Sequence, residues 1–281
     1  MAEPEPHHHA HARTLPVRGD LRLVTALSLL VAILMALASL AGWLSPSTLY
    51  PTEEAIQSFV ANDMVNLVLG LPILLGSMAA ARRGRLIGLL FWPGGLLYVF
   101  YNYLAYLVGV PMAWPWLLYL PLVLLSLIAL ILLVSRLDGA VLRARLLGAL
   151  HERFAGGALV LFGVFVLLRD LSVLAGAQTD ATVNLALELP VIVADFALSI
   201  AWIVVGVQLW RQRALGYKLG AGMLFQGSML FVGVIAYFLL QPALAGTPLA
   251  VADIAVLAAT SLVCFIPLAR VGRGILQRDR T

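Results

Sequence analysis

The stretch ALVLFGVFVLLRDLSVLAG, residues 158–176, decides the fold class of this chain. An apolar run of this length fits a helix that crosses the ~30 Å hydrocarbon core of a bilayer. It contains Arg169, the only one of the 18 Lys and Arg residues that lies inside an apolar stretch, and Asp170 follows directly. A charge in hydrocarbon costs several kcal/mol unless it is paired or hydrated, so Arg169 is the first candidate for a functional site.

The rest of the chain has the same apolar character. Hydrophobic residues make up 62% of the 281 residues and charged residues 11%, and the mean hydropathy is +0.99. Soluble domains carry roughly 25% charged residues. The sequence therefore predicts an all-α integral membrane helical bundle with eight transmembrane helices. The predicted spans are residues 21–43, 57–80, 86–109, 115–135, 155–177, 186–209, 217–240 and 249–269.

The cations predict how these spans are oriented. The other 17 Lys and Arg residues form five clusters beside the apolar runs, and all five lie on one side of the predicted bilayer. The positive-inside rule places that side and both termini in the cytoplasm, with the protein in the plasma (inner) membrane. Despite the net charge of +4, this distribution favours anionic lipid headgroups at the cytoplasmic face over nucleic acid as partners. The clusters are Arg13, Arg18 and Arg22; Arg82, Arg83 and Arg85; Arg136, Arg143, Arg145 and Arg153; Arg211, Arg213 and Lys218; and Arg270, Arg273, Arg278 and Arg280.

Three segments divide the chain. Residues 1–20 are polar and proline-bearing, which predicts a disordered cytoplasmic tail. Residues 21–270 hold the eight-span transmembrane domain, and residues 271–281 are predicted to be a cytoplasmic basic tail. Residues 137–152 carry apolar residues at helical spacing with arginines between them. This pattern favours either a short amphipathic helix on the inner membrane surface or an ordinary connector.

An internal duplication is one interpretation of the spacing between the two halves. Asp63 in the second span and Asp195 in the sixth are 132 residues apart, and Pro111 and Pro242 are 131 apart. Each half holds four spans that begin in the cytoplasm, which predicts two parallel four-helix repeats. Chance spacing of similar hairpins is the alternative, because residue identity at this offset is slight.

Polar residues within the spans form one layer toward the outside. At 1.5 Å per residue, Asp63 lies about 9 Å, Asn102 about 10 Å, Arg169 about 12 Å and Asp195 about 13 Å from the outer end of its span. We predict a solute site in this layer. Its candidate residues are Arg169, Asp195, Asp63, Asn66, Asn102, Tyr98, Glu188 and Asp170.

Helical spacing groups these polar residues into stripes. Residues three, four and seven apart share a helix face, and polar stripes in a bilayer point to other helices or to a hydrated cavity. The motif WPGG at residues 92–95 predicts a break in the third span, and Pro72 and Pro190 predict kinks. The stripes are Asp63, Asn66 and Gly70; Tyr98, Asn102 and Tyr106; and Glu188, Asp195 and Ser199.

Arg169 needs an acidic partner on another helix. Asp195 is the first choice, because it lies at a similar depth and its span follows that of Arg169, and Asp63 is the second. Asp170 points about 100° away on the same helix, so it is poorly placed as the sole partner. Two interpretations stay open: an ion pair that clamps the bundle, or an outward-facing site in which Arg169 anchors an anion and the carboxylates titrate.

Several classes of membrane enzyme are excluded by missing residues. No histidine lies in a span, Cys264 is the only cysteine, and the only lysine, Lys218, lies at the end of the seventh span. Zinc proteases of the HExxH type, bis-histidine haem proteins and retinal proteins all need such residues. The chain also has no GxSxG motif and no Gly-rich phosphate loop. We therefore expect no catalytic residue, no metal and no cofactor.

Three apolar segments resemble a group of uncharacterised bacterial multi-pass membrane proteins. The segments are NDMVNLVLGLP at 62–72, WPGGLLYVFYNYLAYLVG at 92–109 and LPVIVADFALSIAWIVVGVQLWRQRALGYKLG at 189–220. The resemblance implies a multi-pass membrane protein and brings no activity with it.

Three functions are compatible with this sequence. The leading hypothesis is a small secondary transporter or solute-binding membrane protein whose outward-facing polar site takes a small solute or a proton. The alternative is a membrane scaffold or interaction subunit with a structural intramembrane ion pair. A membrane-embedded enzyme that uses the carboxylates as acid and base ranks third, so we expect a non-enzymatic role first.

Overall fold

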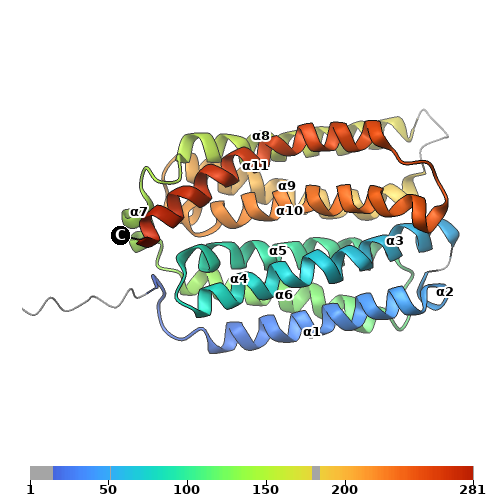
Figure 1. The fold of residues 1–281 in the computed structure, drawn as a ribbon, viewed down its shortest axis with the longest axis horizontal. Coiled ribbons are helices and arrows are strands. Elements are labelled where there is room, and N and C mark those ends of the chain that lie inside the picture. Colours follow the sequence, from blue (N-terminus) through green and yellow to red (C-terminus); the bar gives the residue numbers. More distant parts are fainter. Residues whose placement is uncertain (1–14, 51, 179–183, 281) are drawn as a thin grey trace, which may run out of the picture.

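The computed structural model describes residues 15–50, 52–178 and 184–280, which form a helical bundle (Figure 1). The long helices run side by side along the longest axis of the molecule and are joined by short connections. The elements are α1 (Arg22–Leu44), α2 (Pro46–Leu49), α3 (Glu53–Val65), the π-helical turn η1 (Asn66–Gly70), α4 (Leu71–Arg82), α5 (Leu86–Gly109), α6 (Trp116–Arg136), α7 (Gly139–Leu146), α8 (Glu152–Gly176), α9 (Leu185–Trp210), α10 (Ala214–Ala245) and α11 (Val251–Arg280).

Eight helical units in the described residues are long and apolar enough to cross a membrane. Seven of them are single helices, and the second is the continuous run α3–η1–α4. Each unit overlaps one predicted span, so the predicted all-α bundle of eight transmembrane helices is confirmed. The chain is a multi-pass membrane protein.

Large apolar side chains cover the outside of the bundle, and the largest fully buried side chains are tryptophans and tyrosines. Val68 is 78% exposed and Leu117 is 76% exposed, as expected of side chains that contact lipid tails. In the interior, the Trp92 indole donates to the Ser28 hydroxyl over 3.0 Å and the Trp202 indole donates to the Gln226 carbonyl over 2.9 Å. Helix α5 is the most enclosed of the eight spans.

The WPGG motif does not break α5, which is one continuous helix with Pro93 inside it. The predicted break is therefore wrong. A Cβ atom on Gly94 would overlap the backbone carbonyl of Gly222 on α10. Small residues let transmembrane backbones approach closely, so the glycine serves helix packing rather than helix opening.

The irregular backbone lies in the second span instead, at η1 directly before Pro72. Proline has no N–H group, and its ring clashes with the carbonyl of the residue four positions earlier, here Val68. A π-helical turn widens the backbone and relieves this clash. The distortion predicted at Pro72 is thus present, as a π turn within a span that continues through α4.

Two contacts between α5 and α10 join equivalent positions of the two halves of the chain. The Phe91 and Phe225 rings stack at a centroid distance of 4.5 Å, and Gly94 meets Gly222. With an offset of 131 residues, position 91 corresponds to 222 and position 94 corresponds to 225. Exchanging corresponding positions therefore turns the 91–225 contact into the 222–94 contact. Two parallel repeats would produce this pattern around an axis between α5 and α10. Common ancestry of the halves stays a prediction.

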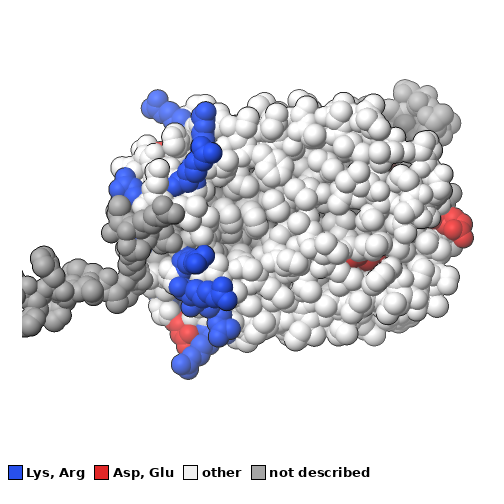
Figure 2. All heavy atoms as spheres, viewed as in Figure 1, with Lys and Arg blue, Asp and Glu red and all other residues white. Residues whose placement is uncertain are grey.

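The cations gather at one end of the bundle, which we call the basic end (Figure 2). Residues 15–20, predicted to be part of a disordered tail, are packed there against the connection between α6 and α7. The Arg18 amide donates to the Arg136 carbonyl over 2.6 Å, and the Asp138 amide donates to the Pro16 carbonyl over 2.9 Å. An isolated bridge joins Val17 to Leu137. The remaining tail, residues 1–14, lies outside the described residues.

The C-terminal segment also differs from the prediction, because α11 continues to Arg280 through most of the predicted basic tail at 271–281. Val271 and Ile275, one helical turn apart, are 1% and 0% exposed, so packing against the bundle extends the helix. Residues 137–152 include the short helix α7. Its Leu142 and Leu146 are buried, so its apolar side faces the protein.

Candidate functional site

The candidate site is a cluster of charged and polar side chains around Arg169, which we call the Arg169 cluster. Its members are Arg169 and Asp170 on α8, Glu188 and Asp195 on α9, and Tyr101 on α5. Arg169 Nη1 donates to Asp170 Oδ1 over 3.0 Å, and Nη2 donates to Glu188 Oε2 over 2.8 Å. Asp195 Oδ2 lies 3.9 Å from Nη1. The Tyr101 hydroxyl donates to Asp195 Oδ1 over 2.9 Å.

The packing of α8 against α9 positions this cluster. A Cβ atom on Gly156 would overlap the backbone carbonyl of Gly206, and a Cβ atom on Gly163 would overlap the backbone carbonyl of Ser199. In both pairs the residue numbers sum to 362, which defines an antiparallel register. The same register sets Arg169 opposite position 193, between Glu188 and Asp195. Close glycine contacts therefore hold the two helices so that the guanidinium reaches both carboxylates.

Burial increases along the predicted α9 stripe toward the bundle interior. The Glu188 side chain is 38% exposed and the Asp195 side chain 13%, while Ser199 is 0% exposed. Asp170 Oδ2 and Ser199 Oγ are buried and have no hydrogen-bond partner. The cluster is thus partly exposed at Glu188 and has buried polar atoms without a hydrogen-bond partner at Asp170 and Ser199.

The charge of the cluster favours a positively charged ligand. One guanidinium faces three carboxyl groups, a formal balance of −2 when all three are ionised. Arg169 already donates to two of these carboxylates, so it is a poor anchor for an anion. An additional cation or proton would reduce the excess negative charge and satisfy the free oxygen of Asp170.

The predicted partners of Arg169 are correct in part. Asp195, the first choice, is within ion-pairing distance, although the hydrogen bonds go to Asp170 and Glu188. Asp170 does contact the guanidinium, as one partner among three rather than the sole one. Asp63, the second choice, is wrong as a partner because its carboxylate is held by tyrosines in a different part of the bundle.

Asp63 belongs to a second polar group between the run α3–η1 and α5, which we call the Asp63 seam. The Tyr50 hydroxyl donates to Asp63 Oδ2 over 2.6 Å, and the Tyr106 hydroxyl donates to Asp63 Oδ1 over 2.8 Å. Gly70, two helical turns further along, faces the ring of Tyr98. The polar stripes predicted for the second and third spans therefore lie against each other.

The register of this seam brings Asn66 opposite Asn102. Asp63 contacts Tyr106, and Gly70 contacts Tyr98. The residue numbers of the two pairs sum to 169 and 168, and a nearly constant sum is the mark of two antiparallel helices in one register. Asn66 and Asn102 also sum to 168, so they lie between the two observed contacts. Asn102 donates to the backbone carbonyl of Tyr98 over 2.9 Å. Both side-chain polar atoms of Asn66 are buried without a partner.

The eight predicted site residues thus fall into two groups rather than one. The first holds Arg169, Asp170, Glu188 and Asp195, and the second holds Asp63, Asn66, Tyr98 and Asn102. Two contributors were missed by the sequence analysis. Tyr50 lies in the polar connection SPSTLYPTEE, outside every predicted span, and Tyr101 is not a member of the predicted polar stripes. Tyr101 is adjacent to Asn102 and so points about 100° away from the polar stripe of α5, and no pattern in the sequence indicated its role.

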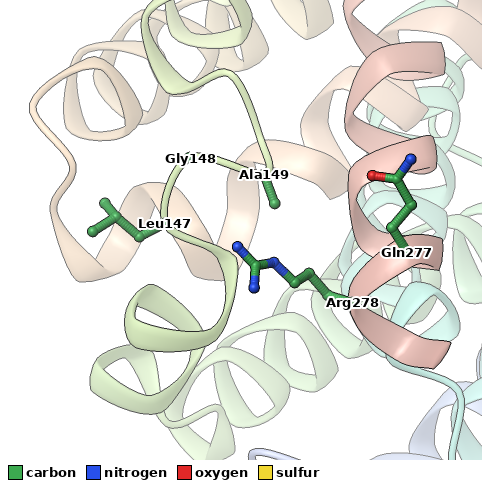
Figure 3. A pocket seen from close by; sticks show the side chains of 5 residues that line it. All are labelled: Leu147, Gly148, Ala149, Gln277 and Arg278. Atoms are coloured by element: carbon green, nitrogen blue, oxygen red, sulfur yellow. The ribbon is translucent and has the colours of Figure 1, made fainter. Parts of the chain in front are cut away.

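A separate hollow lies at the basic end, between the α7–α8 connection and the end of α11 (Figure 3). Its volume is about 360 Å³, and its lining residues are Leu147, Gly148, Ala149, Gln277 and Arg278. It has no carboxylate or histidine in its lining. It therefore has the character of a surface groove next to cations rather than of a reaction centre.

No group of three or more His, Cys, Asp or Glu side chains in the described ranges has an arrangement that could hold a metal ion. Comparisons with models of known families, with curated proteins and with solved structures found no match.

Proposed function

We propose that this protein is a small secondary transporter or solute-binding membrane protein whose solute is positively charged and binds at the Arg169 cluster. The observation that carries this proposal is the set of three carboxyl groups around a single guanidinium at one end of the membrane-spanning bundle. A negative excess within a transmembrane bundle is costly, and a cationic solute would offset it when the carboxyl groups are ionised. Such residues mark ion and solute pathways in membrane proteins.

The proposed orientation opens the site to the outside. The basic end, with the C-terminal end of α11, would face the cytoplasm of a cell bounded by this plasma (inner) membrane, and its cations would contact anionic lipid headgroups. Arg169 is seven residues from the end of α8 that lies away from the basic end, or about 10 Å. Reporter fusions after residues 48, 112, 180 and 245 should all be extracytoplasmic, and a cytoplasmic signal at any of them would overturn this orientation.

Ligand-dependent thermal stability tests the proposed solute class. The purified protein is heated in detergent with sodium, ammonium, guanidinium or choline as the chloride, and with sodium acetate or phosphate at matched ionic strength. At a concentration 100 times its Kd, a bound cation stabilises the folded protein by about 2.7 kcal/mol. We expect stabilisation by one of these cations, and a loss of that effect in Glu188→Gln.

Glu53→Gln is the matched control, because Glu53 is an exposed acid at the start of α3, outside the cluster. It should retain the response of the wild type. Equal stabilisation of Glu188→Gln, or stabilisation by acetate or phosphate alone, would overturn the proposal. Uptake of the stabilising cation into proteoliposomes then separates a transporter from a solute-binding protein.

A membrane scaffold is the second candidate, and one observation favours it. Arg169 is hydrogen-bonded within the protein, to Asp170 on its own helix and to Glu188 on α9, so the cluster also acts as a clamp between α8 and α9. In that case no cation in the panel would change the stability of the wild type. The same melting experiment therefore distinguishes the two functions.

A further inference from the structure

Asp63 is a fully buried carboxyl group that no cation balances. It is 0% exposed, and its contacts in the described part of the chain are hydroxyl groups rather than Lys, Arg or His. A carboxylate removed from water and from positive charge is costly, whereas the neutral acid is tolerated. The group is therefore placed where a proton binds well.

The hydrogen-bond network around Asp63 has room for one more proton. The Tyr106 hydroxyl faces two acceptors, Asp63 Oδ1 at 2.8 Å and the Phe59 carbonyl at 3.2 Å, but it has a single hydrogen. When Asp63 is ionised, Tyr106 donates to it. When Oδ1 carries a proton, that proton is donated to the Tyr106 oxygen, and Tyr106 turns its own hydrogen to Phe59. Both states keep the same heavy-atom positions.

The surroundings of Asp63 are neutral on every side. Tyr50 and Phe59 stack at 5.2 Å, and Tyr106 lies 4.8 Å from Phe59 and 5.3 Å from Tyr119 between ring centroids. These rings, from the α2–α3 connection, α3, α5 and α6, shield the carboxyl group from water.

The contacts described for the other helices packed against α3 involve no charged side chain in this region. Helix α1 contributes Gly42, where a Cβ atom would overlap the carboxylate, and Ser39, which is hydrogen-bonded to Tyr103. Helix α10 contributes Gly233 against Val65 and Gln241, which donates to the Gln57 carbonyl. Among the side chains that the structure describes, the titratable groups that contact Asp63 are therefore tyrosines.

Asn66 lies one helical turn from Asp63 and provides the polar contact that a proton carrier needs. Its amide is 0% exposed, and both its nitrogen and its oxygen lack a partner. A buried amide of this kind favours a small polar ligand that both donates and accepts, such as a water molecule. The π turn that starts at Asn66 is a further irregularity of the type found at functional sites.

We propose that Asp63 is a reversible proton-binding site, with Asn66 holding the hydronium or water molecule that exchanges the proton. In the binding step, the hydronium transfers a proton to Asp63 Oδ1 and remains as water on the Asn66 amide; release is the reverse. Tyr106 is a positioning residue that redirects its hydrogen. The Asp63 seam is separate from the Arg169 cluster, so this inference does not rest on the proposed solute site.

Infrared difference spectroscopy of the purified full-length protein tests this inference. Spectra recorded between about pH 5 and pH 9 cover the range in which a neutral acid and its carboxylate would interconvert at physiological conditions. We expect a carboxylic acid C=O band that appears on acidification and is lost in Asp63→Asn. Asp253→Asn, at an exposed site at the start of α11, is the control and should keep the band.

Tyr50→Phe keeps the carboxyl group and gives a second test if Asp63→Asn does not fold. The Tyr50 hydroxyl donates to Oδ2, the carbonyl oxygen of the protonated group, so its loss should shift the band to higher frequency. A band that persists in Asp63→Asn, or that is unmoved by Tyr50→Phe, would overturn the proposal. So would the absence of any pH-dependent band. A band lost in Asp195→Asn instead would assign proton binding to the Arg169 cluster.

Discussion

Replacing Arg169 by leucine should separate three carboxylate interactions that differ in burial more than in distance. The Asp170 side chain is 3% exposed, Asp195 13% and Glu188 38%, while the respective distances to the guanidinium are 3.0, 3.9 and 2.8 Å. If distance decided the strength, Glu188 would be the strongest partner. If burial decides it, the order is Asp170, then Asp195, then Glu188.

Coulomb's law indicates which factor is larger. With the dielectric constant of water, a pair at the Glu188 distance gains about 1.5 kcal/mol, whereas an effective value of 20 gives about 4 to 6 kcal/mol at the Asp195 and Asp170 distances. Desolvation removes most of this gain, and the 40% exposure of Arg169 reduces it further. We expect coupling free energies of about 2 kcal/mol with Asp170, about 1 kcal/mol with Asp195 and less with Glu188.

Double-mutant cycles in detergent measure these couplings. Each cycle combines Arg169→Leu with Asp170→Asn, Asp195→Asn or Glu188→Gln, and the free energy of unfolding is obtained from denaturant titrations. Arg169→Leu alone should be more destabilising than its combination with Asp170→Asn, because the single variant leaves a buried charge uncompensated. A coupling to Glu188 that equals or exceeds the coupling to Asp170 would refute the argument from burial.

Two further predictions concern packing and pH. Gly94→Ala should lower the free energy of unfolding by about 3 kcal/mol, because its Cβ would overlap the Gly222 carbonyl, while Gly76→Ala, in open space, should be neutral or slightly stabilising in the same unfolding assay. The ion pair with Arg18 lowers the pKa of Asp138 below its ordinary value near 3.8. The stabilisation that this ion pair gives to the folded state is therefore present at neutral pH, and it is lost as the pH falls through the lowered pKa of Asp138. Protection of the amides at residues 15–20, taken as the exchange rate relative to that of an unfolded peptide at the same pH, should fall in acid, and Asp138→Asn should show little protection at every pH; protection in the wild type that does not change with acid would contradict this.

The number and order of the spans could be predicted because length, hydropathy and cation clusters are properties of each segment alone. The two polar stripes of the Asp63 seam were also predictable, since helical spacing gave Asp63, Asn66 and Gly70 one face. The grouping of site residues was not predictable. Similar depth made Asp63 and Asp195 look like members of one layer, and depth says nothing about which side of α5 each residue occupies.

Other errors have a common physical cause, the neighbour that a local pattern does not reveal. The glycines of WPGG suggested a broken helix, but Gly94 is small because Gly222 lies against it. The basic residues after residue 270 suggested a tail. Val271 and Ile275 occur one turn apart among those residues, and this spacing was the overlooked sign that the helix continues.

The contact between residues 15–20 and the α6–α7 connection has a consequence for biosynthesis. These residues are translated before α1, but the groups they bind, Arg136 and Asp138, are translated only at and after the end of the fourth span, α6. The contact therefore cannot form until the first four spans have been synthesised. Because α1 also packs against α6, this late contact closes the N-terminal half before α8 to α11 are complete. Deleting residues 15–20 should leave later steps intact and expose the unfinished half to membrane proteases during synthesis.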